Sequence, residues 1–178
     1  MSGPQIEETG FAGLKLLRPP THADTRGLFF KPFNPAYFDR SLELAEVYYS
    51  ESHANVIRGM HFQIPPAAHT KIVSVVKGSV LDVVVDLRRD QATFGKHYQT
   101  RLDTSSRAAL LIPEGFAHGF AALSDETVVL YLQTSAHAPE CDRGIRFDSF
   151  GFDWGLSQPI LSDRDRSFPA LAEFDSPF

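Results

Sequence analysis

The sequence predicts an all-β fold, a sandwich or barrel of the jelly-roll kind. Short runs of apolar and β-branched residues recur between glycine and proline turns, and helical patterns are almost absent. Phenylalanine is abundant, with 15 residues against 5 tyrosines, and such rings fill the space between packed sheets. The length of 178 residues fits a single domain, residues 1–178, with an irregular tail from about residue 149.

The first half of the chain holds one good helical candidate. Residues 34–44 favour a short helix, because Pro35 stands near the start and Phe38 and Leu42 are apolar. Residues 24–27 form a turn, and Pro32 places the next strand at an edge or a bulge. The pattern of apolar residues predicts strands over residues 14–18, 28–33, 46–50 and 56–62.

The strongest hairpin signal lies in the middle of the chain. Two β-branched runs, residues 72–76 and 80–87, are separated by Lys77, Gly78 and Ser79. Apolar residues alternate in the second run, which predicts that one face of that strand is buried. Further strands are expected over residues 98–102, 108–112 and 127–133, and the tail should contain a short helix.

Composition argues against several classes of function. A net charge of −5 is unlike a general nucleic-acid binder, because affinity for phosphate backbones comes from a broad excess of lysine and arginine. No apolar run approaches the roughly 18 residues of a membrane span, and the first residues do not resemble a signal peptide. We therefore expect a soluble cytoplasmic protein without membrane partners. The single Cys141 cannot form an internal disulfide.

The chain is organised around residues 56–66 and the apolar run that begins at Lys71. Arg58 and His61 lie on the first strand, and Lys71 opens the next one. A histidine flanked by two cations on neighbouring strands suggests a base beside a site for negative charge.

A second motif, Pro113-x-Gly115-x-x-His118, looks like the second cupin motif, in which a glycine turn presents a histidine inside the barrel. The first cupin motif normally supplies a pair of histidines and a glutamate that bind a metal. Here Phe62 and Gln63 follow His61, so a metal site would lack ligands and we expect none. A metal-dependent cupin oxygenase or isomerase using His61, His118 and a carboxylate stays the alternative enzyme.

Several motifs in order, from about residue 11 to residue 170, resemble the dTDP-4-dehydrorhamnose 3,5-epimerase family. The resemblance implies a metal-free cupin-type jelly roll without cofactors, normally a homodimer, that acts on nucleotide-linked 4-keto-6-deoxyhexoses in deoxysugar synthesis. The motifs are Asp24-Thr25-Arg26-Gly27-Leu28-Phe29, Arg58-Gly59-Met60-His61-Phe62-Gln63, Lys71, the run from Gly78 to Arg88, the run from Pro113 to Phe120, Tyr131 and Ser162-Asp163-Arg164-Asp165.

The same resemblance implies roles for individual residues. His61 would be the base, Asp165 its orienting partner, Lys71 the stabiliser of the enolate and Tyr131 the acid. Arg26, Arg58 and His118 would contact the substrate and its phosphates, which suits the planar guanidinium. The chemistry agrees, because inverting a carbon next to a ketone needs a base on one face and an acid on the other. Taken alone, Tyr131 would be a packed strand aromatic and Asp165 a solvated turn carboxylate.

The chain departs from the family pattern at positions linked to the nucleotide. Such changes alter the hydrogen bonds that the pocket can form with a nucleotide base. Either the enzyme recognises a different nucleotide or a modified sugar, or neighbouring residues compensate and thymidine recognition is intact. The substituted positions are Lys31 for glutamate, Glu46-Val47-Tyr48 for Gln-Asp-Asn, His137 for a tyrosine associated with stacking on thymine, Asp142 for glutamate and Arg164 for lysine.

Two further questions stay open at this level. A non-catalytic sugar-nucleotide binding module is possible in principle, but the pairing of His61 with Tyr131 argues against it, since binding needs no acid and base. The motifs also do not decide whether C3, C5 or both carbons are inverted. The histidines that match no motif, His22, His53, His69 and His97, are expected at the surface.

Overall fold

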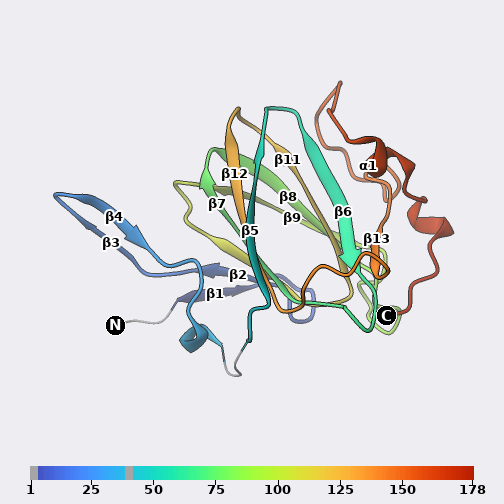
Figure 1. Cartoon of the computed structure of the whole chain (residues 1–178), viewed down its shortest axis with the longest axis horizontal. Coiled ribbons are helices and arrows are strands. Elements are labelled where there is room, and N and C mark those ends of the chain that lie inside the picture. Colours follow the sequence, from blue (N-terminus) through green and yellow to red (C-terminus); the bar gives the residue numbers. More distant parts are fainter. Residues whose placement is uncertain (1–3, 39–41) are drawn as a thin grey trace.

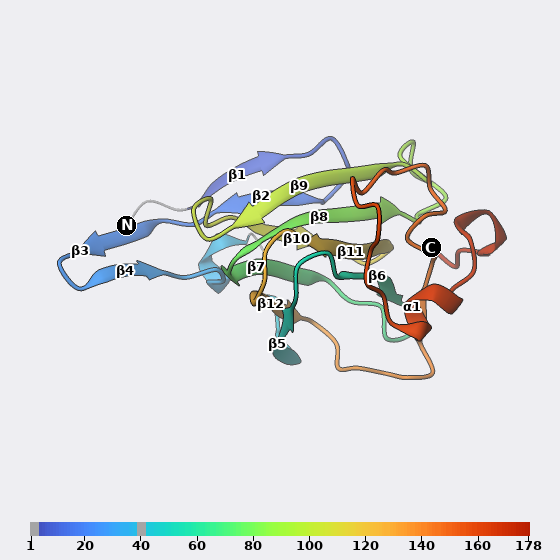
Figure 2. The same cartoon turned by 90° about the horizontal axis from the view of Figure 1, so that it is seen from above.

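The computed structural model describes residues 4–38 and 42–178 (Figure 1). Within them, a six-stranded and a five-stranded antiparallel sheet pack face to face, as Figure 2 shows from above. The first sheet has the order β1 (Gln5–Glu8), β2 (Lys15–Arg18), β10 (Ala109–Ile112), β7 (Lys71–Lys77), β12 (Thr127–Gln133) and β5 (Glu46–Ser52). The second has the order β13 (Asp142–Gly144), β6 (Ile57–Gln63), β11 (Phe116–Ala122), β8 (Ser79–Asp86) and β9 (His97–Asp103).

The chain crosses repeatedly between the two sheets, and the predicted all-β jelly roll is confirmed. From β5 to β8 each strand lies in the sheet opposite its predecessor, and the same holds from β9 to β12. Valines, leucines and phenylalanines from both inner faces meet in one core, including Val73, Leu110, Val84 and Phe120. This burial is the main force that holds the sheets together.

The outer faces of both sheets are also covered. The C-terminal segment, with α1 (Asp163–Ser167) and η2 (Leu171–Glu173), runs over the five-stranded sheet (Figure 1). Its aromatic side chains, such as Trp154 and Phe174, pack on Ile57 and Met60. On the other side, residues around Phe38 cover Ile72 and its neighbours. No helix among the described residues has the length and apolar character needed to cross a membrane.

A separate two-stranded hairpin, β3 (Thr21–Asp24) and β4 (Gly27–Phe30), projects from the body of the molecule (Figures 1 and 2). We call it the arm. Its side chains are largely exposed, including Leu28 at 48% and Phe29 at 57%. Exposed apolar side chains on a protruding hairpin are typical of a surface that another molecule covers.

The predicted hairpin over residues 72–87 is wrong. Strand β7 pairs with β10 and β12, whereas β8 pairs with β11 and β9 in the other sheet. A tight glycine turn serves a hairpin and a crossing between sheets equally well, so the local signal cannot distinguish them. The predicted buried face of the second run is confirmed, but the opposite face is buried as well: Val84 faces the core between the sheets and Val83 faces the C-terminal segment.

The predicted helix over residues 34–44 is wrong as well. The structure has one turn, η1 (Pro35–Tyr37), and Phe38 is already extended. Residues 42–44 have no regular structure, and residues 39–41 lie outside the described residues. Phe33 stacks on Phe38 at 5.7 Å between ring centroids, and both lie against the sheet. Packing of these rings overrides the local helical preference.

Smaller differences concern short strands and two histidines. The strands β1, β3 and β13 were not predicted, because short polar segments carry no apolar alternation. His69, expected at the surface, is buried. His97 is half-buried and packs on Phe152, with ring centroids 5.0 Å apart. His22 and His53 are exposed, as predicted.

Candidate active site

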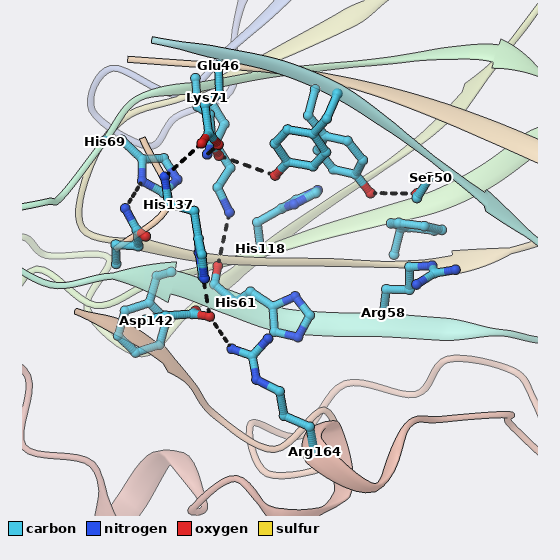
Figure 3. A pocket seen from close by; sticks show the side chains of 16 residues that line it. Glu46, Ser50, Arg58, His61, His69, Lys71, His118, His137, Asp142 and Arg164 are labelled. Carbon is cyan, nitrogen blue, oxygen red and sulfur yellow. Dashed lines mark hydrogen bonds and ion pairs between the residues drawn. The ribbon is translucent and has the colours of Figure 1, made fainter. Parts of the chain in front are cut away.

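A pocket of about 420 Å³ opens between the two sheets (Figure 3). Side chains of both sheets line it, together with the loop after β12 and the helix α1. Most residues singled out from the sequence are among them, namely Glu46, Tyr48, Arg58, His61, Lys71, His118, Tyr131, His137, Asp142 and Arg164.

A β-bulge in β6 lets Arg58 and His61 face the pocket together. Side chains alternate along a regular strand, so residues three apart would lie on opposite faces. Opposite β11, however, His118 pairs with His61 and Phe120 pairs with Arg58, so β6 contains one extra residue. Gly59 takes up this residue at φ +136°, and a Cβ there would lie 2.5 Å from the Cα of Gly119. Only glycine fits this position without displacing β11.

His61 is held by a carboxylate from the C-terminal segment. Its Nε2 lies 2.8 Å from Oδ1 of Asp165, and Oδ2 of Asp165 accepts a hydrogen bond from the amide of Gly59 at 3.1 Å. Burial alone would raise the pKa of Asp165, but the hydrogen bonds from His61 and Gly59 outweigh it and hold the pKa below its usual range. An ionised carboxylate therefore fixes the imidazole and can stabilise its protonated form.

The helix α1 places Asp165 in this position. Ser162 caps its N-terminus and accepts a hydrogen bond from the amide of Asp165 at 3.1 Å. Asp165 is only 4% exposed, in contrast to its neighbours Arg164 and Arg166. The serine cap is a local sequence signal for the start of a helix, but the partner of Asp165 comes from a distant strand.

Lys71 brings a cation to the same pocket. As Figure 3 shows, its side chain reaches from β7 toward β6, where Nζ lies 3.5 Å from the carbonyl oxygen of His61. Burial lowers the pKa of Lys71 to about 8, against the attraction of Asp142 and Asp82. The ammonium group is therefore poorly solvated and available to a negative charge that forms beside it.

Tyr131 lies on the opposite sheet from His61. Its hydroxyl is 3.3 Å from Oγ of Ser50, and its ring stacks on Tyr48 at 4.8 Å between centroids. Burial raises the pKa of Tyr131, so the phenol keeps its proton at neutral pH. A proton acceptor and a proton donor thus line one pocket from two facing sheets.

A second histidine and carboxylate pair lies deeper. Nε2 of His118 is 2.9 Å from Oδ2 of Asp82, and both side chains are buried. Although His118 and His61 are cross-strand neighbours, each is bonded to its own carboxylate. Residues 4–38 and 42–178 contain no group of three or more His, Cys, Asp or Glu placed to hold a metal ion.

The nucleotide-linked positions form a polar network at one end of the pocket. Glu46 accepts hydrogen bonds from the side chain of Gln133 at 3.0 Å and from the amide of His137 at 3.1 Å. Asp142 accepts one from Arg164 at 2.6 Å (Figure 3). The two groups meet where Nδ1 of His137 lies 4.0 Å from Oδ2 of Asp142, so Glu46, His137, Asp142 and Arg164 form one connected wall.

Arg58 lies at the edge of the pocket, whereas Arg26 and Lys31 lie outside it. Arg58 is held at the edge of the pocket by hydrogen bonds to Oγ of Ser52 and to the carbonyl oxygen of Glu51, both at 2.9 Å. Arg26 is exposed on the arm and paired with Asp24. Lys31 lies just after the arm, with Nζ 5.6 Å from the ring centroid of Phe29. Neither Arg26 nor Lys31 lines the pocket of its own chain.

Six lining residues were given no site role by the sequence reasoning: Ser50, Phe62, Gln63, His69, Phe120 and Gln133. Gln63 donates to the carbonyl oxygen of Ala67 at 2.9 Å and accepts from the amide of Ala138 at 2.7 Å, which ties two loops together. Burial and the nearby Lys71 lower the pKa of His69 to about 3, so its imidazole is neutral. Strand alternation could have identified Gln133 from Tyr131 and Gln63 from His61.

Comparison with known proteins agrees with this geometry. A family model described as dTDP-4-dehydrorhamnose 3,5-epimerase matches residues 8–173. The dTDP-4-dehydrorhamnose 3,5-epimerase of Methanothermobacter thermautotrophicus is 40% identical over 174 residues, which cover 93% of this chain and 94% of that protein. A dTDP-4-dehydrorhamnose 3-epimerase of Streptomyces niveus is 37% identical over 175 residues, 95% of this chain and 84% of that one.

A solved structure shares the whole fold. It is a dTDP-6-deoxy-D-glucose-3,5-epimerase from Legionella pneumophila in complex with dTDP-4-keto-L-rhamnose, with a TM-score of 0.91 and 31% identity. The match covers 97% of this chain and 95% of that chain. The fold, the family model and the relatives agree over nearly the full length, and this chain therefore belongs to the dTDP-4-dehydrorhamnose 3,5-epimerase family, whose members are nucleotide-sugar isomerases.

Proposed function

We propose that this chain epimerises a nucleotide-linked 4-keto-6-deoxyhexose next to its C4 ketone, without a metal ion. One observation carries the proposal. His61, bonded to Asp165, and Tyr131, with its proton held by burial, line the same pocket from opposite sheets, and Lys71 lies beside them. A sugar ring between the sheets would have a base on one face and an acid on the other.

The reaction then proceeds in two proton transfers. His61 removes the proton from the carbon next to the ketone, and the electrons of the broken C–H bond move onto the ketone oxygen. The ammonium group of Lys71 stabilises this enolate, and it does so strongly because its site is desolvated. Tyr131 delivers its proton to the opposite face, which inverts the carbon. Proton exchange with water restores neutral His61 and the phenol.

The nucleotide is assigned to polar side chains that surround the reaction centre. Arg58 offers a guanidinium to the diphosphate, and His118 contacts the sugar. Related proteins act on dTDP-linked sugars by their names, whereas Glu46, His137, Asp142 and Arg164 depart from the family pattern that the sequence resemblance gave. Calorimetric titration with dTDP, CDP, UDP and GDP decides between a changed base and an intact thymidine site. A clear preference for dTDP removes the idea of altered specificity.

The protein acts as a homodimer in this proposal, with the arm of one copy reaching the pocket of its partner. The arm supports this because it projects from the body, exposes Leu28 and Phe29, and holds Arg26 away from its own pocket. Cytoplasmic location, expected from the sequence, stays a prediction.

Mixing two inactive variants tests the arm. In a dimer of Arg26→Ala with His61→Ala, one pocket would combine an intact His61 with an intact Arg26 from the other copy. An equal mixture, unfolded and refolded together, should recover about a quarter of wild-type activity, since half of the dimers are mixed and half of their pockets are intact. If Arg26 serves its own pocket, or the protein is a monomer, mixing restores nothing.

The central experiment follows deuterium by proton NMR in D2O on a panel of nucleotide 4-ketosugars. Each carbon that is deprotonated takes up deuterium, so the spectrum also identifies whether C3, C5 or both react. His61→Ala should abolish uptake, and Tyr131→Phe should abolish inversion. A wild-type protein that binds the sugar nucleotide but never exchanges its protons would be a binding module, and the proposal would be wrong.

A further inference from the structure

Tyr48 lies at the reaction centre as well as beside the nucleotide-linked wall. It stands on β5 directly opposite Tyr131 on β12. The two rings are nearly parallel, with an interplanar angle of 16° and 4.8 Å between centroids. The rings of Tyr131 and His118 are also neighbours, with centroids 6.3 Å apart and an interplanar angle of 71°. The proposed proton donor therefore has two aromatic neighbours, of which Tyr48 is the nearer.

The ring of Tyr48 is itself anchored. Its hydroxyl lies 3.2 Å from Oε1 of Gln133, whose amide nitrogen donates to Glu46 at 3.0 Å. Glu46 in turn accepts from the amide of His137. Because the nitrogen of Gln133 is engaged as a donor, its oxygen must accept, so Tyr48 donates. Burial, followed by the charges of Glu46 and Asp142, raises the pKa of Tyr48 to about 12, which keeps this donor protonated.

The hydroxyl of Tyr131 has few hydrogen-bonding restraints of its own. Its hydroxyl has one protein partner among the described residues, Ser50, at the long distance of 3.3 Å. A phenol that delivers a proton to one face of a carbon must be held closely, because a displacement of about 1 Å can cost roughly a hundredfold in rate. The anchored ring of Tyr48 supplies a restraint that a small side chain at this position could not supply.

We propose that Tyr48 is a positioning residue for the inversion step, which holds the phenol of Tyr131 against the face opposite His61. The inference rests on the proposed function, in which Tyr131 is the proton donor. It assigns Tyr48 to the reaction and not to the nucleotide, and it predicts that deprotonation by His61 is independent of Tyr48.

The test compares inversion with exchange. In D2O, His61 can return deuterium to the face from which it took the proton, so exchange without inversion reports the base alone. Tyr48→Leu should lower the ratio of inverted product to exchanged substrate about tenfold, equivalent to about 1.4 kcal/mol, with KM and exchange close to wild type. Tyr48→Phe keeps the stacked ring and should retain most of the ratio. Tyr49→Leu, on the same strand with a 69% exposed side chain, is the matched control.

Each other outcome overturns the inference. Equal losses of exchange and inversion in Tyr48→Leu would indicate general damage, and a raised KM with an unchanged ratio would indicate substrate binding. In the Tyr131→Phe background, where inversion is already abolished, Tyr48→Leu should leave the remaining exchange unchanged, and a loss of that exchange contradicts a role through Tyr131. Failure of the wild type to exchange or invert any sugar on the panel overturns the epimerase assignment too, whereas wild-type turnover with an unchanged ratio overturns the role of Tyr48 alone.

Discussion

Asp165 and His61 are 104 residues apart in the chain, and their side chains meet at 2.8 Å. The carboxylate comes from the segment that covers the outside of the five-stranded sheet, and the imidazole comes from the inside of that sheet. Between them lies the bulge at Gly59, whose amide also binds Asp165. The proposed base is therefore assembled from two elements, α1 and the bulged strand β6, and its three residues can be changed separately.

Replacing Asp165 with asparagine should lower kcat about a hundredfold while leaving the fold intact. The amide keeps the shape of the side chain but cannot stabilise the imidazolium that forms when His61 takes a proton. Steady-state kinetics on the preferred sugar nucleotide measure the effect. Asp163→Asn, an exposed change in the same helix, should leave kcat unchanged. Equal losses in both variants would mean that the helix and not the carboxylate matters.

Asp165 should also contribute to stability in a pH-dependent manner. Its pKa is lower in the folded protein than in the unfolded chain, so its contribution is complete above about pH 4 and is lost as the pH falls through the folded value. Urea unfolding between pH 2 and pH 7 should show a weaker acid destabilisation in Asp165→Asn than in the wild type. Parallel stability curves would contradict the lowered pKa.

The buried charge of Lys71 should lower the free energy of unfolding while it raises kcat. Its pKa falls from 10.5 to about 8 on folding because of burial, so the unfolded chain binds the proton more tightly and the folded state is penalised at pH 7. Lys71→Met should remove this penalty of about 3 kcal/mol and lower kcat at least a hundredfold. The stability difference should shrink as the pH rises from 8 to 10.5. A methionine variant that is less stable at pH 7 would show that the charge is well compensated.

The same shift predicts how the wild-type rate varies with pH. As the pH rises past about 8, Lys71 loses its proton and the enolate loses its cation. The kcat profile should therefore decline on the alkaline side, and Lys71→Arg should move that decline to higher pH in whatever activity it retains. A flat profile up to pH 10 would remove Lys71 from the reaction.

Gly59→Ala should destabilise the protein by about 3 kcal/mol and abolish activity. The new Cβ would collide with the backbone of Gly119, and the positive φ adds strain. Gly151→Ala is the matched control, because Gly151 also has a positive φ of +73° but nothing lies within 4 Å of its Cβ position. Urea unfolding should find a loss of only about 1 kcal/mol there. Similar losses at both sites would show that the close approach of β6 and β11 is unimportant.

The parts of the site that follow from strand alternation could be predicted from the sequence. Lys71 and Tyr131 lie on long apolar strands, and the family motifs place His61 and His118 on neighbouring strands. The shared face of Arg58 and His61 could not be derived from a period of two, because it depends on the bulge at Gly59. The pairing of Asp165 with His61 could be inferred only by resemblance, since no local pattern links a short helix to a distant strand.

The failures in the fold have a common cause. The turn at Gly78 and the segment after Asn34 each carry a local signal that is compatible with two structures. In both places long-range packing decides, between β7 and its partners in one case and between Phe38 and the sheet in the other. The role of Arg26 could not be derived from a single chain, because Arg26 lies on the arm, outside the pocket of its own chain. In our proposal it reaches the pocket of a second copy.

The C-terminal segment has a consequence for the life of the protein in the cell. It both shields Ile57 and Met60 from water and supplies Asp165 to His61. A molecule from which this segment has detached should therefore lose activity and expose apolar surface at the same time. Detachment of the segment would inactivate the protein and would also expose apolar surface that chaperones and proteases bind. Inactive copies should therefore be removed and stay few.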